Sequence, residues 1–257
     1  MKRIFILLFA IILSLPIFSA EKETKVLIKT TVGKITVKLY NDTPLHRDNF
    51  LNLVQEHQYD SIMFHRVIKL FMIQAGEKYA PFDTTKQINV IDTAQVKIKF
   101  LKKVVRTITF QSFKKKKDKT SYPYDPNYKA PEHTIPAEIV YPKYFHKRGQ
   151  LCAARFEDKT NPERKSSGFQ FYIVTGKFFT DYDLDKMEIE RNITLTPEQR
   201  QAYKVEGGAP HLDGTYTIFG EVTKGMKVVQ KIELSTVGFN DDPLKEIRIK
   251  KTKILKK

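Results

Sequence analysis

The stretch that decides the fold is Phe64-His65-Arg66-Val67-Ile68-Lys69-Leu70-Phe71-Met72-Ile73-Gln74-Ala75-Gly76. Read as a strand, it places Phe64, Arg66 and Ile68 on one face, because side chains alternate between the two faces of a strand. The charged guanidinium then shares its face with large apolar side chains. That arrangement costs free energy unless Arg66 has a task there.

Apolar and amide side chains follow Arg66 closely. Phe71 and Met72 supply an apolar floor, Gln74 an amide that both donates and accepts hydrogen bonds, and Gly76 lets the chain turn. Together they predict a hydrophobic pocket for a neutral ligand with one polar atom. The alternative is an ordinary buried strand in which Arg66 extends its charged end to water.

Four blocks of the sequence resemble a known family. Phe64–Ile68 with Phe71–Gln74 is similar to the signature of the cyclophilin family of peptidyl-prolyl cis/trans isomerases. The later blocks follow in the family's order: Gly149–Arg155 (GQLCAAR), Phe169–Ile173 (FQFYI), and His211–Gly214 (HLDG) running to Phe219–Val222 (FGEV). The resemblance, closest to the bacterial exported branch, implies a mainly β fold: a closed antiparallel eight-stranded barrel with capping helices. It also implies isomerisation of X-Pro peptide bonds.

The resemblance assigns roles at the predicted pocket. It makes Arg66, Gln74 and Phe71 the catalytic positions, with Arg66 donating to a twisted amide. The substrate-binding positions contact the proline ring or the residues before it: Phe64, Met72, Ala154, Arg155, Gln170, Tyr172, Leu212, His211 and Tyr216. No nucleophile, metal or nucleotide is needed, so we expect no cofactor and proline-containing polypeptides as substrates.

Four positions depart from the commoner family pattern. His211 stands where many eukaryotic members carry Trp, and Tyr216 where they carry His. Tyr172 replaces the more usual Phe and adds a hydroxyl at the pocket. Arg155 replaces Asn, which should keep a main-chain contact while changing the charge near the substrate. Because His211 lacks the indole N–H, we expect only weak inhibition by cyclosporin.

The N-terminus has the pattern of a secretory signal peptide. A short basic region, 1–3, precedes the almost wholly apolar run 4–18 of a 257-residue chain. We expect cleavage after Ala20 and a periplasmic or cell-envelope location, with an uncleaved membrane anchor as the alternative. The single cysteine, Cys152, excludes an intramolecular disulfide and is expected to pack as a small apolar residue.

The rest of the chain predicts one isomerase domain, 24–257, with two insertions. A hairpin turns at 31–33, a helix starts at Pro44 with Thr43 as its N-cap, and a strand closes the chain over 246–255. A helix is also expected over 225–232. The second insertion, 180–208, should hold a short helix that starts after Thr196 and ends near Lys204.

The first insertion, about 80–128, predicts a basic β-hairpin arm. Apolar and polar residues alternate on both sides of Lys102-Lys103, and ten Lys or Arg face one Asp between Lys97 and Lys119. The plain interpretation is a solvated face with a flexible tip at 114–117. The alternative is a docking surface for an acidic protein or anionic membrane headgroups. Nucleic acid is not expected, because no aromatic residues interleave with the lysine run.

Three functional classes remain open from the sequence. An exported isomerase that assists folding is the leading hypothesis, and a monomer is expected. A chaperone module that holds prolyl peptides in the same groove, with incidental turnover, is the second. A structural envelope protein on the same scaffold is the third, and the intact set of Arg66, Gln74 and Phe71 weakens it.

Overall fold

The computed structural model describes residues 23–76, 87–100, 103–117 and 133–255. These residues form two compact units, one made of 23–76 with 133–255 and the other of 87–100 with 103–117. The first unit holds all the predicted site residues. The predicted signal peptide, 1–20, lies outside the described residues, among which no helix is both long and apolar enough to cross a membrane.

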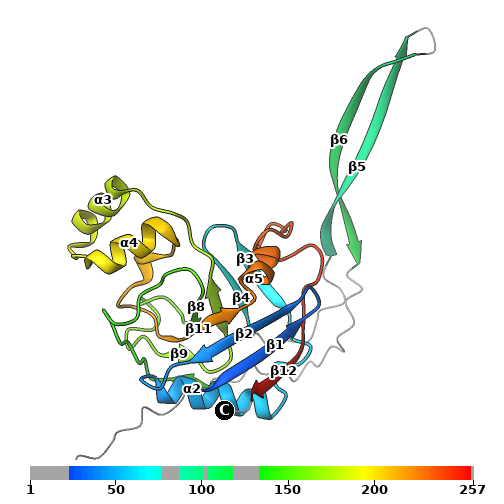
Figure 1. The fold of residues 1–257 in the computed structure, drawn as a ribbon. Coiled ribbons are helices and arrows are strands. Elements are labelled where there is room, and N and C mark those ends of the chain that lie inside the picture. Colours follow the sequence, from blue (N-terminus) through cyan, green and yellow to red (C-terminus); the bar gives the residue numbers. More distant parts are fainter. Residues whose placement is uncertain (1–22, 77–86, 101–102, 118–132, 256–257) are drawn as a thin grey trace, which may run out of the picture. The chain divides into compact units, whose positions relative to one another are not determined.

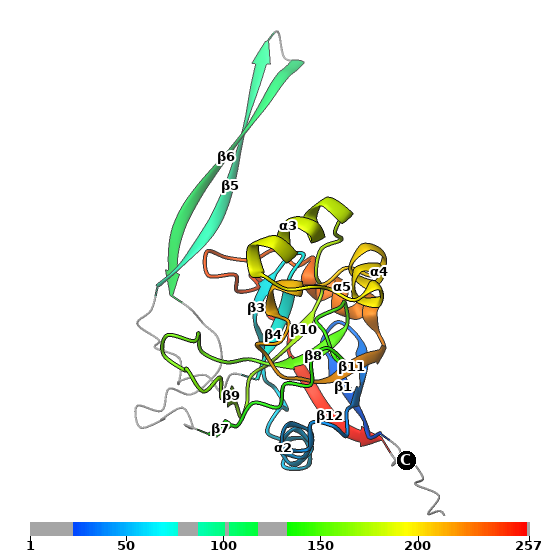
Figure 2. The same ribbon diagram turned by 90° about the vertical axis from the view of Figure 1, so that its left-hand side faces the viewer.

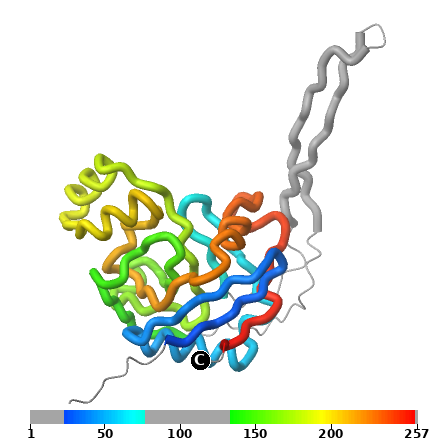
Figure 3. Tube along the Cα trace, viewed as in Figure 1, coloured from blue at the N-terminus to red at the C-terminus, as the bar shows by residue number. Residues whose placement is uncertain are grey.

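The first unit is built on one eight-stranded antiparallel sheet (Figure 1). Its strands are β1 (Lys25–Thr30), β2 (Lys34–Leu39), β3 (Phe64–Ile68), β4 (Met72–Ala75), β8 (Gln150–Ala153), β10 (Phe171–Val174), β11 (Ile218–Lys224) and β12 (Ile249–Leu255). The spatial order is β12-β1-β2-β11-β8-β10-β4-β3. Figure 3 shows β1 and β12, from opposite ends of the chain, side by side, and their residues pair from Lys25↔Leu255 onward.

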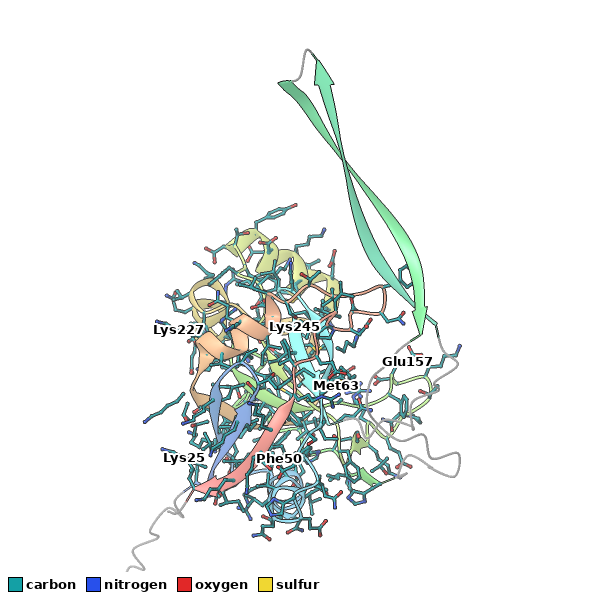
Figure 4. The ribbon with its side chains drawn as sticks, turned by 90° about the vertical axis from the view of Figure 1, so that its right-hand side faces the viewer. Lys25, Phe50, Met63, Glu157, Lys227 and Lys245 are labelled. Carbon is teal, nitrogen blue, oxygen red and sulfur yellow. The ribbon has the colours of Figure 1, made fainter. Side chains whose placement is uncertain are left out.

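The two edge strands of this sheet meet and close it. Met63 pairs with Arg248 in an antiparallel bridge, the Phe64 N–H donates to the Ile247 carbonyl (2.9 Å), and the Ile249 N–H donates to the Ile62 carbonyl (2.8 Å). Figure 4 labels Met63 beside the start of β12. The closing strand was predicted over 246–255, but the regular strand β12 begins only at Ile249. Ile247 and Arg248, just before it, contact the opposite edge of the sheet. The predicted eight-stranded fold is confirmed.

The interior of the barrel follows from strict alternation along the first hairpin. Val26 and Ile28 on β1 face Val37 and Ile35 on β2, and all four are fully buried while their neighbours are not. A single apolar face of this kind stabilises a sheet only by packing against another element. Helix α2 (Pro44–Gln55) supplies one, with Phe50 reaching into the same interior cluster, and α5 (Met226–Glu233) covers the other end (Figures 2 and 4).

Two central strands, β8 and β10, are buried on both faces. On β10, Phe171 and Ile173 belong to the interior cluster, whereas Tyr172 and Val174 belong to a second cluster on the outer face. The same alternation holds on β8, where Cys152 faces outward between buried neighbours. The outer cluster exists because the chain from Ala209 to Ile218 covers these strands. It provides a dry surface on which a pocket can form.

A β-bulge corrects the predicted facing of Phe64 and Arg66. Phe64 pairs with Ala75 but Arg66 pairs with Gln74, so the register shifts at His65. One extra residue in a strand reverses the alternation from that point. Phe64 and Val67 therefore both point into the interior, and Arg66 is freed to the outer face. The prediction that Phe64 and Arg66 share a face is wrong.

The predicted start of α2 is right, but its predicted cap is not. The Thr43 side chain makes no capping hydrogen bond. Instead the Glu138 carboxylate accepts from the Leu45 N–H (3.0 Å) and the His46 N–H (2.9 Å), and lies 2.6 Å from His46 Nδ1. A carboxylate from a distant segment thus satisfies two free donors of the first helical turn and suits the positive end of the helix dipole.

The second insertion forms two helices, α3 (Asp181–Arg191) and α4 (Pro197–Val205). Helix α4 has the predicted capping box between Thr196 and Gln199 and ends one residue after the predicted Lys204. Helix α3 was not predicted, although Thr180 and Asp183 form a second capping box there. The two helices enclose a small cluster around Leu184 and Tyr203, both fully buried.

The remaining short elements connect these parts. Strand β7 (Thr134–Ile135) pairs with β9 (Ser166–Ser167), and a 3-10 turn, η2 (Pro210–Leu212), follows α4. Helix α5 spans nearly the predicted 225–232, with Gly225 at φ +98°, a conformation that favours glycine.

The second unit is the predicted hairpin. Strand β5 (Gln87–Phe100) pairs in antiparallel register with β6 (Lys103–Lys117), from Gln87↔Lys117 to Phe100↔Lys103. The strands meet at the pair Phe100↔Lys103, so Lys103, expected in the turn, is the first residue of β6. Lys114–Lys117, however, pairs with Gln87–Val90 at the opposite end from the turn, so the prediction of a tip there is wrong.

Candidate active site

A hollow of about 120 Å³ opens over the outer face of β4 and β10. Nine of the predicted site residues line it: Arg66, Phe71, Met72, Gln74, Ala154, Arg155, Tyr172, Leu212 and Tyr216. They come from β3, the turn between β3 and β4, β4, β10, the residues just after β8, and the covering segment that includes η2. Residues that are far apart in sequence thus converge on one surface.

Arg66 stands at the rim of the hollow with its charge accessible. Its side chain is 46% exposed, and its Nε lies 3.7 Å from Oδ2 of Asp241, which is 43% exposed. The Val67 N–H donates to the Asp241 carbonyl (2.8 Å), which ties that loop to β3. Because the ion pair is long and solvated, Arg66 keeps N–H groups that a ligand can use.

Gln74 is held by a second amide. Its Nε2 donates to Oε1 of Gln170 at 2.7 Å, and Gln74 pairs across the sheet with both Arg66 and Tyr172. This contact uses the Gln74 Nε2, so the side-chain oxygen of this lining residue can accept a hydrogen bond from a ligand. Gln170 itself is not among the lining residues, so the structure gives it the position of a partner to Gln74.

The floor of the hollow is apolar. Met72, Tyr172 and Leu212 are nearly fully buried and belong to one cluster, against which Phe71 packs. His211 lies outside this lining, with its ring 5.2 Å from that of Phe71 at a tilt of 40°. A small apolar ring fits such a floor.

The Tyr172 hydroxyl does not face the hollow, contrary to prediction. It lies 3.1 Å from Nε2 of His146, whose side chain is completely buried. Burial raises the pKa of Tyr172 well above its ordinary value. The ring therefore lines the hollow as a phenylalanine would, and its polar end is used behind the floor.

Arg155 also differs from the prediction. Its side chain is only 4% exposed, pairs with Asp158 at 2.6 Å, donates from Nε to the Thr215 carbonyl (2.9 Å), and lies 4.2 Å from the centre of the Tyr216 ring. The salt bridge offsets its charge, so little free charge faces the substrate. Its structural effect is to hold Tyr216 in place.

The main chain at this rim singles out Arg155 rather than Ala154. The Ala154 N–H donates to the Gln170 carbonyl (3.0 Å), and the Ala154 carbonyl accepts from the Ser167 N–H (2.8 Å). Among the described residues, the Arg155 N–H and carbonyl take no part in a backbone hydrogen bond. An extended peptide can therefore pair with Arg155, whereas Ala154 contributes its small side chain.

Phe64 is the predicted site residue that the structure places away from the hollow altogether, whereas Gln170 and His211 contact residues that line it. Phe64 is 1% exposed and packs in the barrel interior, because of the bulge at His65. It supports β3 from behind and does not line the hollow.

Sequence reasoning missed the residues that surround the hollow without lining it. Asp241 and His146 contact lining residues, Asp213 contacts His146, and Tyr203 contacts Asp213. His146 and Asp213 fall within or beside the recognised blocks, so their types were visible, but their pairing was not. Within the described ranges, no group of three His, Cys, Asp or Glu is arranged to hold a metal ion.

The protein is an antiparallel barrel with a ligand-binding hollow on its outer face. The hollow combines an apolar floor, an accessible guanidinium and a fixed amide, which suit a peptide. A family described as "Cyclophilin type peptidyl-prolyl cis-trans isomerase/CLD" matches residues 25–254. The chain belongs to this family, and its activity is peptidyl-prolyl cis/trans isomerisation.

Individual relatives agree with this assignment. The chain is 28% identical over 228 residues to peptidyl-prolyl cis-trans isomerase cypE of Dictyostelium discoideum, covering 88% of this chain and 95% of that protein. It is 26% identical over 234 residues to peptidyl-prolyl cis-trans isomerase-like 1 of Aspergillus fumigatus, covering 90% and 96%. The fold agrees with a crystal structure of a cyclophilin type isomerase from Cryptosporidium parvum, which matches with a TM-score of 0.54 at 21% identity and covers 91% of this chain and 99% of that one.

Proposed function

We propose that this isomerase binds X-Pro segments of exported or cell-envelope proteins, with the proline ring in the hollow, and that Arg66 stabilises the twisted amide. The observation that carries the mechanism is the position of Arg66. It lines the hollow beside an apolar floor formed by Met72, Tyr172 and Leu212, and it retains accessible N–H donors.

The chemistry requires a donor and no covalent step. Rotation about the peptide bond has a barrier of about 18–20 kcal/mol because it breaks amide resonance. At the halfway twist the proline nitrogen regains a lone pair that the planar forms lack. A donor aimed at that nitrogen binds the twisted state more strongly than either planar state, and such differential binding lowers the barrier.

The other lining residues would orient the substrate. The Gln74 amide, fixed by Gln170, offers its oxygen to the substrate main chain, and the Arg155 backbone offers an edge for the residues before proline. Phe71 and Leu212 would hold the proline ring while the preceding residue rotates. Fixed positioning of this kind removes the entropy cost of finding the reactive geometry.

A proline-peptide isomerisation assay with two Arg66 variants tests the role of Arg66. Arg66→Ala should lower kcat/KM by about 100-fold, the size of effect seen when one preorganised donor is removed. Arg66→Lys should lower it by a similar order, because the charge stays but the planar fork of N–H groups is lost. Lys69→Ala, which removes an exposed positive charge next to β3, is the matched control and should change little. Unchanged activity in Arg66→Ala would remove Arg66 from the mechanism.

The exported location rests on the sequence pattern of residues 1–20. Expression of the full chain in a bacterium, followed by fractionation and N-terminal sequencing, tests it. A periplasmic product beginning at Glu21 is expected. A product retained in the cytoplasm with Met1 in place would overturn the location but not the isomerase chemistry.

A further inference from the structure

A buried series of hydrogen bonds runs behind the hollow, through Tyr203, Asp213, His146 and Tyr172. The Tyr203 hydroxyl donates to Oδ2 of Asp213 at 2.5 Å. Oδ1 of Asp213 accepts from the main-chain N–H of His146 (2.8 Å) and lies 2.9 Å from its Nδ1. His146 Nε2 then lies 3.1 Å from the Tyr172 hydroxyl. The His146 and Asp213 side chains are 0% and 2% exposed, so water does not compete with these bonds.

The chemistry of each group fixes the direction of the bonds. A carboxylate only accepts, so Nδ1 of His146 carries a hydrogen toward Asp213. In the neutral form of the ring, Nε2 is then an acceptor, and the Tyr172 hydroxyl donates to it. Each member therefore orients the next, and such buried networks are rigid when every group has a partner.

Tyr172 is the member that touches the substrate site. Its backbone is fixed on β10 between Cys152 of β8 and Gln74 of β4, and its ring lines the hollow. With the hydroxyl also bonded to His146, the ring is held at both ends. It cannot tilt into or away from the hollow without breaking a buried hydrogen bond.

Tyr203 brings the second insertion into this network. It lies on α4 and is itself fully buried, with its ring 5.6 Å from that of Phe145 and 6.0 Å from that of Phe179. Gly208 permits this approach, because a Cβ at that position would lie 2.5 Å from the Tyr203 ring. The helices of the insertion thus fix the far end of the hydrogen-bond series.

We propose that Tyr203, Asp213 and His146 are positioning residues through which helix α4 holds the Tyr172 ring as a rigid wall of the hollow, and so sets the affinity for the proline residue. The proposal rests on the proposed function, since it assumes that the proline ring occupies this hollow. A wall contacts the substrate in both the planar and the twisted state. Loosening it should therefore raise KM and leave kcat nearly unchanged.

The test measures kcat and KM for a proline peptide with the full chain and its variants. Tyr203→Phe removes one hydroxyl at the insertion end and should raise KM by roughly threefold or more, with kcat within about twofold of wild type. Tyr172→Phe cuts the series at the other end and should have the same effect. It also tests the proposal if Tyr203→Phe does not fold. In the double variant the second change should add nothing, because the series is already broken.

Two controls separate positioning from simple loosening. Tyr182→Phe is the same chemical change on α3, at a side chain 75% exposed, and should leave KM unchanged. Thr196→Ala removes the cap of α4 without touching the hydrogen-bond series, so it should lower the melting temperature but not raise KM.

Three results would overturn the proposal: an unaltered KM in folded Tyr203→Phe and Tyr172→Phe, an equal rise in KM in Thr196→Ala, or additive effects in the double variant. These outcomes are distinct from failure of the proposed mechanism. That failure would appear as undiminished kcat in Arg66→Ala, measured separately.

Discussion

Arg66 and Asp241 face each other at the rim of the hollow, with 3.7 Å between Nε and Oδ2, while the Asp241 carbonyl accepts from the N–H of Val67. The side-chain pair is about half exposed on both sides, and exposed pairs contribute about 0–1 kcal/mol. The main-chain contact therefore fixes this loop, and the carboxylate adds little.

From this geometry, the free energy of unfolding of Asp241→Asn should lie within about 0.5 kcal/mol of the wild-type value. The variant should keep kcat/KM within roughly threefold of wild type. Urea denaturation and the proline-peptide assay measure the two quantities. A loss of activity of tenfold or more in a stable variant would show that the carboxylate is needed to position Arg66.

Glu138 should be important for stability, since its carboxylate accepts two N–H groups of α2 and contacts His46. We expect Glu138→Ala to lower the free energy of unfolding by about 1–2 kcal/mol, the usual cost of losing a helix cap. Glu138→Gln keeps an acceptor and should cost less. Glu56→Ala, at the other end of the helix, is the control. Equal stabilities of Glu138→Ala and wild type in urea would contradict the capping role.

Stability should fall in mild acid because of His65. Burial, and then the positive charge of Arg66, lower the pKa of His65 to about 4, against an unfolded value near 6.5. Between these two values the unfolded chain binds a proton that the folded chain does not. The free energy of unfolding should therefore decrease as pH falls from about 6.5 to 4, by up to about 3 kcal/mol. Burial also lowers the pKa of His46, which acts in the same direction.

His65→Gln should flatten this dependence on pH, and urea denaturation at a series of pH values measures it. His57→Gln is the matched control, because the His57 side chain is 61% exposed and lies beside Asp60. An equally steep decline in His65→Gln would show that other groups cause the acid sensitivity.

Cyclosporin should inhibit this protein weakly. His211 stands at the edge of Phe71, outside the lining of the hollow, and carries no indole N–H. One lost hydrogen bond of ordinary strength weakens binding by about tenfold. His211→Trp should restore that factor in an inhibition assay. Nanomolar inhibition of the wild-type protein would contradict the prediction.

Local patterns predicted the elements that local forces determine. The alternation of Ile35, Val37 and Leu39 with polar neighbours predicted the second strand of the first hairpin. Thr196 with Gln199 predicted the start of α4. The lining of the hollow was predicted from whole sequence blocks, which specify side-chain types at fixed positions.

The features that could not be predicted depend on long-range contacts or on one extra residue. Glu138 caps a helix that begins more than 90 residues earlier, and nothing near Thr43 in the sequence indicates that its own hydroxyl is not used. The bulge at His65 puts Phe64 and Arg66 on opposite faces of the sheet. A regular alternation of side chains along the strand predicts the same face for both. Tyr172 looked like a polar pocket residue because its partner, His146, lies on another segment.

The basic hairpin should be separable from isomerase activity. All the lining residues belong to the unit formed by 23–76 and 133–255. Gly76 and His133, which flank the segment 77–132, both lie beside residues 168–169. A Cβ at Gly76 would lie 2.0 Å from the Phe169 carbonyl oxygen, and the Gly168 N–H donates to the His133 carbonyl at 2.8 Å. A short Gly-Ser linker can therefore replace residues 77–132 without pulling on the barrel. The shortened chain should keep kcat/KM for a small proline peptide within about twofold.

If the hairpin binds acidic partners or unfolded chains, the same variant should lose suppression of aggregation, and reversing the charges of Lys97, Lys99 and Lys103 in the full chain should reproduce that loss. A folded deletion variant without isomerase activity would show instead that the hairpin is part of the catalytic unit.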